Sequence, residues 1–403
     1  MSESSILGQV ALSYSPMIDR QRTVCATRLT VFPIAQGVPL DAAALLEEVS
    51  RVWPAGGPQV SLNVLSESLL SDLLRAAPAP NLMIELPAFM AADEAHSEGI
   101  RALHANGNTL LIKGRPLREL PREVLPCFKH SIIDLADDRR VGETGALPLG
   151  HARNISFIQA GVHKIADMEA SFQRSAVAVL GWPMDDAISH AAASPTAAKA
   201  AAPDLQVIVE LIHRVDQAED IERLEATLKR DPTLAFKLMR YINSPAFGLS
   251  VEINSFRHAI MLLGYNRLKR WLALLLATAS KDPNMRPVMF AAVRRGMLME
   301  ELARTAADDE MRNELFICGV FSLLDRIFHQ PFSALLQTIP VPERVYQALA
   351  ESSGPYQPYC ELVRAVEGDE VHAFRDACDR LLAAPAEVNR ALMTALANAA
   401  SIE

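Results

Sequence analysis

Cysteine, basic charge and long apolar runs are all scarce in this chain of 403 residues, and each scarcity excludes a class of protein. Its cysteines number only five, and no two of them form a C-x-x-C pair. An odd, scattered set does not build the disulfide framework of a small secreted domain. The sequence therefore predicts reduced thiols in a cytoplasmic protein.

Basic residues do not outnumber acidic ones, since the formal net charge is -9 and the isoelectric point is about 5.6. Nonspecific nucleic-acid binding depends on neutralising phosphates, so nucleic acid is disfavoured as a partner. One local basic cluster, Arg267, Lys269 and Arg270, is a candidate interaction surface. Its alternative interpretation is a solvated helix face, because helices commonly carry Lys and Arg on their exposed side.

Long apolar runs are absent as well. The most apolar stretch, residues 271–279, is far shorter than the roughly 20 residues that a membrane span requires. At the N-terminus, Glu3 stands where a signal peptide would carry basic residues. We expect a soluble cytoplasmic protein without membrane association.

The length of the chain and a change in composition predict two domains. A chain this long exceeds what one hydrophobic core usually serves. Small residues and two prolines dominate "DDAISHAAASPTAAKAAAPD" at 185–204, which is typical of a linker. We predict a first domain over 1–184, a linker over 185–202 and a second domain over 203–403.

Short apolar runs alternate with amphipathic segments in the first half. Examples are "QVSLNVL", "NLMIELP", "NTLLIKG", "ISFIQAG" and "AVAVLGWP". Such an alternation predicts parallel strands covered by helices, as in a β/α barrel or an open α/β sheet. A full eight-fold barrel typically takes about 250 residues. Any barrel in the first half must therefore be trimmed, with helices shortened or lost.

The second half changes to helical spacing. Leu224 and Leu228 share one predicted helix face, and Leu234 and Leu238 share the next. Asp231 is expected to be the N-cap of the second of these helices, with Pro232 at its first position. Gly264 follows a third apolar face and is expected to end that helix. No segment alternates with period two, so an all-helical domain is predicted.

Two neighbouring segments of this half carry a family resemblance. They read "RDPTLAFKLMRYINSPAFGL" at 230–249 and "INSFRHAIMLLG" at 253–264. Their features, in this order and spacing, resemble the HDOD domain of bacterial signalling proteins. The matching signature positions are Asp231, Pro232, Asn243, Ser244, Phe247, Gly248 and Gly264. The abrupt stop at Asn243 and Ser244 is interpreted as a tight joint between helices whose side chains bond to backbone ends. Partner contact through its exposed rim is the less favoured alternative.

The HDOD domain is similar to HD-type metal-dependent phosphohydrolases but lacks their catalytic residues. An HD site needs consecutive His and Asp to hold metal ions that activate water. No His-Asp dipeptide occurs in the chain, and Ser322 and Leu323 stand at its expected place, with Asp325 nearby. The histidines of this half are widely spaced. We therefore predict neither a metal site nor a catalytic site there.

The first half resembles a degenerate EAL domain, the fold of cyclic-di-GMP phosphodiesterases. The resemblance rests on the order of "VSLNVLSESLL", "LMIELPAF", "HSIIDLAD" and "FIQAGVHK" along the chain. Active members hold divalent ions with carboxylates. Three of the implied ligand positions keep a ligand-type residue here: Asn63, Glu85 and Asp134. The positions that depart from the family pattern are Arg28, Ala88, Lys113, Gly114, Ile132, Ala160 and His163.

Three ligand-type residues without their partners should not hold two hydrated divalent ions, and Arg28 and Lys113 would repel them. We therefore expect no enzyme, no metal and no cofactor. The surviving polar residues are expected at strand ends, where polar side chains commonly bond to loop backbone. The competing interpretation is vestigial nucleotide binding.

These observations favour a noncatalytic bacterial signalling protein that acts through protein contacts of both domains. The main alternative is a receptor that binds cyclic-di-GMP without cleaving it, although such binding is disfavoured by the altered pocket. Two further alternatives are a residual enzyme using the acidic run of Asp134, Asp137, Asp138 and Glu143, and an RNA or transcription regulator using the basic cluster. Protein partners of a bacterial pathway are expected, and the sequence leaves homo-oligomer formation open.

Overall fold

The computed structural model describes residues 5–35, 37–53, 57–138, 155–186, 203–242, 253, 255–304 and 308–400. The chain divides into two compact units. The barrel unit comprises 1–186 and 364–393, and the helical unit comprises 187–363 and 394–403. Most of the expected linker lies outside the described residues, so the limits at 184 and 203 stay a prediction. The assignment of 364–393 to the barrel unit was not anticipated.

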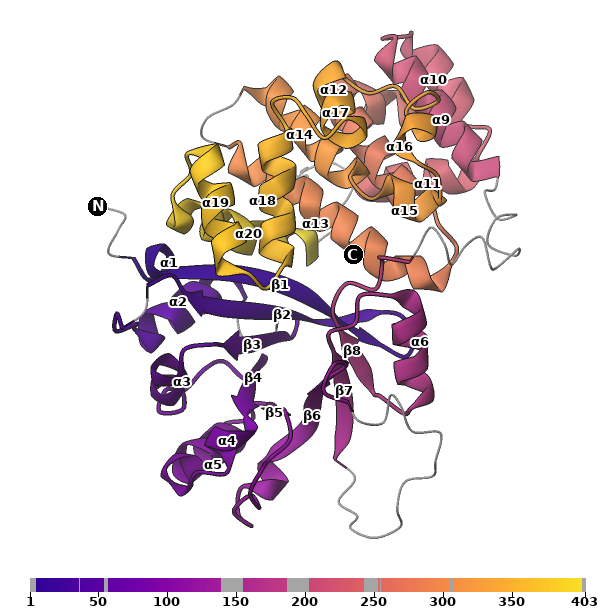
Figure 1. The fold of residues 1–403 in the computed structure, drawn as a ribbon. Coiled ribbons are helices and arrows are strands. Elements are labelled where there is room, and N and C mark those ends of the chain that lie inside the picture. Colours follow the sequence, from indigo (N-terminus) through magenta and orange to yellow (C-terminus); the bar gives the residue numbers. More distant parts are fainter. Residues whose placement is uncertain are drawn as a thin grey trace. The chain divides into compact units, whose positions relative to one another are not determined.

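Eight strands close into a barrel in the order β1 to β8 (Figure 1). Their bounds are β1 (Val10–Asp19), β2 (Val24–Pro33), β3 (Val60–Val64), β4 (Leu82–Pro87), β5 (Leu110–Lys113), β6 (Phe128–Asp134), β7 (Ser156–Ala160) and β8 (Ala178–Leu180). From β2 to β8, each strand runs parallel to the next. The α/β barrel expected from the apolar runs is therefore confirmed.

Short helices connect the strands of the barrel. They are α2 (Ala42–Val52), α3 (Glu67–Leu73), α4 (Ala88–Ala91), α5 (Ser97–Ala105) and α6 (Ile165–Gln173), and one further helix, α1 (Ile6–Gln9), precedes β1. The fully described connection from β5 to β6 contains the 3-10 helix Leu125–Cys127 and no α-helix. This is the kind of trimming that the length of the first half predicted.

Strand β1 is the exception to the parallel order, because it lies antiparallel between β2 and β8. A tight turn joins it to β2, and Asp19 Oδ1 accepts hydrogen bonds from the backbone N–H groups of Gln21 and Thr23, both at 2.9 Å. Such a short connection permits only an antiparallel hairpin. The apolar runs predicted parallel strands, and β1 was not predicted.

The inner face of the barrel carries an apolar layer. Its buried members are Met17, Ala26, Met83, Leu111, Ile132, Ile158, Ala160, Ala178 and Leu180. Side chains alternate between the two faces of a strand, so the next inward position lies two residues further along. Because β2 to β8 are parallel, those next positions in β2 to β6 come together toward one end of the barrel.

The C-terminal segment of the barrel unit contains α19 (Val371–Leu381) and the first part of α20 (Pro385–Ala400). Asn389 of α20 is fully buried, and its side-chain amide donates to the carbonyl oxygens of Leu7 and Val10, both at 2.7 Å. Its Oδ1 accepts the N–H of Leu12 at 3.0 Å. One side chain thus satisfies three backbone groups, one in α1 and two at the start of β1.

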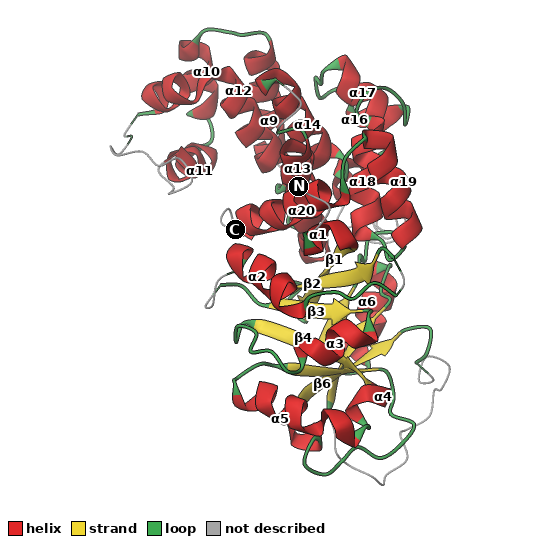
Figure 2. Ribbon diagram, turned by 90° about the vertical axis from the view of Figure 1, so that its left-hand side faces the viewer, coloured by secondary structure: helices red, strands yellow, loops and turns green. Residues whose placement is uncertain are grey.

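The helical unit contains α9 to α17 and most of α18, and its described residues contain no strand (Figure 2). The helices are α9 (Pro203–Asp216), α10 (Ile221–Leu228), α11 (Pro232–Ile242), α12 (Phe256–Ala277), α13 (Arg286–Leu302), α14 (Asp309–Phe321), α15 (Leu324–Phe328), α16 (Phe332–Leu335), α17 (Glu343–Ala350) and α18 (Gln357–Glu367). The all-helical second half is confirmed. No helix in the described residues has the length and apolarity needed to cross a membrane.

Two local predictions in this unit are also confirmed. Asp231 caps α11, since its Oδ1 accepts the N–H of Leu234 at 3.0 Å. Gly264 interrupts α12 with φ +64° and ψ 171°, a conformation that glycine adopts without the steric penalty of a side chain. Leu224, Leu228 and Leu238 are buried as their helical spacing predicted.

Candidate functional site

A polar layer lies on the inner face of the barrel, two residues beyond the apolar layer. Arg28 follows Ala26 in β2, Glu85 follows Met83 in β4, Lys113 follows Leu111 in β5 and Asp134 follows Ile132 in β6. Strand β3 contributes two residues to the same face. We call this set the strand-end site; its members are Arg28, Ser61, Asn63, Glu85, Lys113 and Asp134.

Arg28 and Glu85 form a bidentate ion pair at the centre of the strand-end site. Arg28 Nε donates to Glu85 Oε1 at 2.8 Å, and Nη2 donates to Oε2 at 2.6 Å. The hydroxyl of Ser61 also donates to Glu85 Oε1, at 2.8 Å. Burial is the largest single influence and disfavours the charged guanidinium, but the carboxylates of Glu85, Asp369 and Asp134 together outweigh it, so the pKa of Arg28 is raised. Both oxygens of Glu85 are therefore occupied.

Lys113 and Asn63 form the second contact of the site. Lys113 Nζ donates to Asn63 Oδ1 at 2.7 Å, and Asn63 Nδ2 donates to Thr30 Oγ1 at 3.2 Å. Burial lowers the pKa of Lys113; the nearby charge of Arg28 lowers it further, while Glu85 acts in the opposite direction. Two cationic side chains thus lie on the same inner face.

Asp134 ends β6 and is exposed. Its Oδ1 accepts the backbone N–H of Ala136 at 2.9 Å, as expected for a polar side chain at a strand end. Its charge also helps to raise the pKa of Arg28. Across the barrel edge, Gly161 has φ +72°, and a Cβ at that position would lie 3.0 Å from either carboxylate oxygen of Asp134.

The donor set does not fit a pair of carboxylate-held divalent ions. Both carboxylate oxygens of Glu85 already accept hydrogen bonds, from Arg28 and Ser61. The side-chain oxygen of Asn63 already accepts a hydrogen bond from Lys113. Hard divalent cations prefer several oxygen ligands that remain free to coordinate. Among the described residues, no group of three His, Cys, Asp or Glu side chains is arranged to hold a metal ion.

Four exposed apolar side chains follow the same strand ends. Val38 (46% exposed), Leu65 (47%), Phe89 (62%) and Leu117 (100%) lie in the connections after β2, β3, β4 and β5. These strands are parallel neighbours, so their carboxyl ends meet at one edge of the barrel. We call these four residues the apolar rim.

Asn63, Glu85 and Asp134 were predicted as surviving ligand positions, with Arg28 and Lys113 as departures from the family pattern. Ser61 and Thr30 were not predicted, although they bind Glu85 and Asn63. The alternation within "VSLNV" puts Ser61 and Asn63 on one face, and this signal pointed to Ser61. Nothing in the sequence indicated that Arg28 would pair with Glu85.

The predicted HDOD signature is only partly visible in the structure. Asn243, Ser244, Phe247 and Gly248 lie outside the described residues, so their role as an inter-helix joint stays a prediction. Asp231, Pro232 and Gly264 lie where the helix pattern placed them, at the start of α11 and at the interruption of α12.

The candidate basic surface divides into one exposed residue and two paired ones. Arg270 binds Glu300 through two hydrogen bonds of 2.6 Å and lies over the ring of Phe316. Lys269 Nζ lies 2.8 Å from Asp216 Oδ1, whereas Arg267 is exposed. The role of this surface in partner binding stays a prediction, and Arg267 is its most accessible member.

Ser322 and Leu323 occupy the position expected for an HD pair, and neither is a metal ligand of the HD type. The hydroxyl of Ser322 accepts from Arg295 Nη1 at 3.1 Å, and Leu323 is buried. Burial raises the pKa of Asp325, although neighbouring Arg326 opposes this shift. These contacts stabilise the end of α14 and the start of α15.

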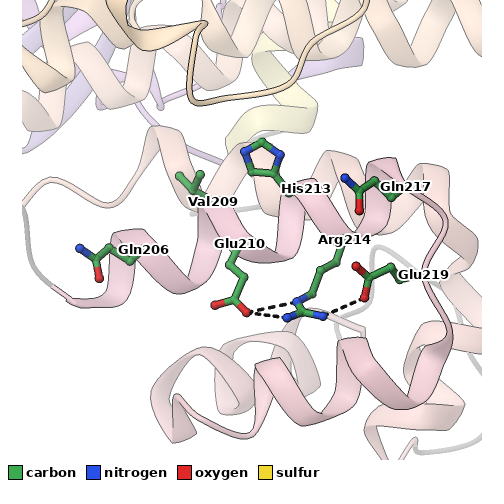
Figure 3. A pocket seen from close by; sticks show the side chains of 7 residues that line it. All are labelled: Gln206, Val209, Glu210, His213, Arg214, Gln217 and Glu219. Atoms are coloured by element: carbon green, nitrogen blue, oxygen red, sulfur yellow. Dashed lines mark hydrogen bonds and ion pairs between the residues drawn. The ribbon is translucent and has the colours of Figure 1, made fainter.

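An open pocket of about 500 Å³ lies along α9 (Figure 3). Its charged groups satisfy one another, since Arg214 binds Glu210 at 2.9 Å and Glu219 at 2.7 Å. The pKa of Glu210 is lowered by its hydrogen bond with Arg214, which opposes the effect of burial. A pocket whose charges are already paired offers little to an ionic ligand.

Comparison with known proteins identifies part of the chain. Residues 202–330 match the HDOD domain family. The uncharacterized protein YuxH of Bacillus subtilis (strain 168) is 29% identical over 164 residues, which cover 40% of each chain. The cyclic di-GMP phosphodiesterase CdgJ of Vibrio cholerae serotype O1 is 26% identical over 177 residues, covering 44% of this chain and 41% of CdgJ. The match thus spans about two fifths of either relative.

Among solved structures, a standalone EAL protein from Vibrio cholerae O395 in its c-di-GMP bound form is similar. It has 16% sequence identity and a TM-score of 0.30, over 43% of this chain and 89% of that chain. A TM-score this low supports no conclusion about function.

The match to CdgJ corrects one expectation. The missing motif residues led to the expectation that this chain is not an enzyme, and a relative named as a phosphodiesterase overturns it. The error came from equating the loss of known metal ligands with the loss of activity. The family match of residues 202–330 agrees with the signature quoted above, and the C-terminal half of the chain therefore contains an HDOD domain.

Proposed function

We propose that this chain is a cytoplasmic bacterial signalling protein whose barrel binds cyclic-di-GMP at the strand-end site and whose HDOD domain contacts protein partners. The observation that carries this proposal is the pair of cationic side chains, Arg28 and Lys113, on the inner face of the barrel. The choice of cyclic-di-GMP as the ligand rests on the name of CdgJ, a cyclic di-GMP phosphodiesterase.

The two cations keep hydrogen-bond donors for a phosphate. Arg28 uses Nε and Nη2 for Glu85, while its Nη1 enters no hydrogen bond among the described residues. Lys113 donates one of its three N–H bonds to Asn63. Charge-assisted bonds from guanidinium and ammonium groups to phosphate oxygens are short and strong. A phosphodiester fits this donor set better than a metal ion does.

The apolar rim fits the remainder of a cyclic dinucleotide. Nucleobases have flat apolar faces that stack on aromatic side chains. Phe89 is a large exposed aromatic residue beside the carboxyl end of β4, only four residues beyond Glu85. A cyclic dinucleotide requires cationic groups for its phosphates and apolar groups for its bases. The strand-end site offers the first, and the apolar rim offers the second.

Calorimetry with cyclic-di-GMP on the full chain tests the proposal. The loss of one charge-assisted hydrogen bond costs about 1.5–3 kcal/mol, so Lys113→Met should weaken binding roughly tenfold or more. Lys129→Met is the matched control, because Lys129 is exposed and lies outside the strand-end site on β6. No heat and no thermal shift with the unaltered chain would overturn the proposal.

Hydrolysis is followed in the same samples with Mg²⁺ or Mn²⁺ added. Turnover would add an activity to the proposed binding and would not contradict it. Equal weakening by Lys113→Met and Lys129→Met would show that the nucleotide binds elsewhere.

A second function, protein contact through the HDOD domain, is supported by exposed apolar side chains. Phe236 (66% exposed) lies on α11, and Met261 (63%) and Leu262 (45%) lie on α12. Exposed apolar residues that gather on one surface often mark a protein interface. Arg267 is exposed further along α12.

Capture of partners from a bacterial lysate tests this second function. Met261→Lys should remove a specific set of proteins that the unaltered chain retains, since a charge on the apolar surface opposes docking. Leu382→Lys is the matched control, because Leu382 is exposed but lies in the barrel unit. Identical sets from both variants would contradict a role for this surface.

A further inference from the structure

A second pocket lies within the helical unit, apart from the α9 pocket described above. It has a volume of about 300 Å³ and is bounded by α9, α12, α14 and the segment before α17. Small-molecule sites occur between the helices of bundles and have volumes from about 300 Å³ upward. The pocket is therefore large enough for a small ligand.

One side of this pocket is apolar. Ile212 of α9, Ala273 of α12, and Ile317 and Phe321 of α14 form it. Ala273 is the smallest of these residues, and its short side chain leaves space between the helices. An apolar body of a ligand would replace water against this wall, which is the usual driving force for binding in such a pocket.

The pocket also has a polar side, formed by residues of the same three helices, and it is largely prearranged. Lys269 is held by Asp216 at 2.8 Å. The buried carboxylate of Glu314 accepts the hydroxyl of Tyr356 at 2.6 Å and Arg344 Nε at 3.0 Å. The charges of these groups are already paired within the protein. They therefore fix the shape of the polar side and need no ligand ion for neutralisation.

Glu310 is an acidic residue on this side that is not paired in the same way. Its carboxylate is exposed at the pocket and enters no hydrogen bond or ion pair in the part of the chain that the structure describes, although its charge acts on Arg344 and helps to raise the pKa of that guanidinium. It lies in the first turn of α14, whose positive dipole end would disfavour a cation. Two further acidic residues, Asp308 and Asp309, occupy the same helix end and offset that dipole.

We propose that this pocket binds a small organic cation with an apolar body, such as an aryl-alkyl amine. The ammonium group pairs with Glu310, and the apolar body packs against Ile317 and Phe321. This site is independent of the cyclic-di-GMP site proposed above, because it lies in the other unit and shares no residue with it.

Binding of phenethylamine to the full chain, measured by calorimetry, tests the proposal. Phenethyl alcohol has the same ring and chain without the charge, and phenylacetate has the opposite charge. Phenethylamine should bind at least fivefold more tightly than either one. Equal binding of all three compounds, or no binding of the amine, would overturn the proposal.

Two charge variants locate the bound amine. Glu310→Gln should weaken phenethylamine binding about fivefold, because a partly exposed ion pair contributes on the order of 1 kcal/mol. Asp309→Asn makes the same charge change in the same helical turn but outside the pocket lining, and binding should stay within twofold. An equal effect of both variants would show a general charge effect and overturn the assignment.

A third variant tests the apolar wall and does not depend on charge. Ile317→Trp places a larger side chain into the pocket and should abolish amine binding, while circular dichroism confirms that the helices remain. Lys113→Met in the barrel should leave amine binding unchanged. Loss of amine binding in Lys113→Met with retention in Ile317→Trp would assign the amine to the barrel and contradict the proposal.

Discussion

Arg28 and Glu85 show how a single buried pair shapes the barrel interior. Both side chains lie largely out of water, and Glu85 is 1% exposed. Removing one partner of a buried pair leaves an uncompensated charge, whereas removing both leaves only a packing defect. The pair therefore stabilises the barrel only as a unit.

Replacement of Arg28 alone should be far more costly than replacement of the pair. We expect Arg28→Met to lower the free energy of unfolding of the barrel unit by about 3–5 kcal/mol, because the Glu85 carboxylate stays buried without its partner. The double variant Arg28→Met with Glu85→Met should lose less than the single variant. Urea unfolding followed by circular dichroism measures both, and an equal loss would contradict this account.

His130 predicts a pH dependence of stability. Burial lowers its pKa from 6.5, Lys129 adds to the shift, and Nδ1 lies 2.6 Å from Ser156 Oγ on β7. As pH falls below 6.5, the unfolded chain takes up this proton before the folded chain does, so stability falls. The loss of Tm between pH 7 and pH 5.5 should be smaller in His130→Gln than in the unaltered chain. If Tm falls equally with pH in both proteins, His130 does not contribute to the pH dependence of stability.

Close contact between two helices is the main feature at the scale of elements. In α14, Gly319 lies against α13, and a Cβ added there would lie 2.5 Å from the carbonyl oxygen of Arg295. In α13, a Cβ at Gly296 would lie 2.9 Å from the carbonyl oxygen of Phe316. Backbone atoms cannot give way as a flexible side chain can, so these two glycines set the separation of the helices.

Gly319→Ala should force α13 and α14 apart. Overpacking of this kind typically costs about 1–3 kcal/mol of stability, and the helical unit should lose that amount in chemical denaturation. Gly368→Ala is the control, because its added Cβ would meet its nearest atoms at an ordinary 3.5 Å. Equal stability of the two variants would mean that the helices adjust without strain.

At the scale of the whole chain, the barrel unit depends on residues far along the sequence. Asn389 binds the backbone of Leu12 from 377 positions away. Tyr14 donates to Glu367 at 3.1 Å, and Trp182 donates to the carbonyl oxygen of Glu367 at 3.1 Å. Residues 364–393 thus belong to the barrel unit, because their side chains and backbone bind residues of the barrel directly.

Asn389→Ala should destabilise the barrel although it lies near the C-terminus. It leaves three buried backbone groups without partners, and each orphaned group costs about 1–3 kcal/mol. We expect a loss of several kcal/mol in the unfolding transition of the barrel. Arg390→Ala, an exposed neighbour on the same helix, should change little. A similar loss in both variants would point to α20 itself rather than to the amide.

The barrel strands were largely predictable from particular residues. Apolar runs such as "NLMIELP" and "ISFIQAG" mark β4 and β7, because strands buried on both faces need apolar side chains on both. Strand β1 was missed because Ser13, Ser15 and Pro16 interrupt its apolar residues. Most of β1 is buried, and Glu367 and Asn389 bind its residues from far along the chain, which no local pattern could indicate.

The sequence by itself determined the two fold classes, the cap at Asp231, the interruption at Gly264 and the HDOD signature, because each depends on residues close together in the chain. Only the tertiary structure decided that Arg28 pairs with Glu85 and that Asn389 completes the barrel unit. These contacts join residues from 57 to 382 positions apart. Closure and register of the barrel bring such residues together, and local sequence patterns contain neither.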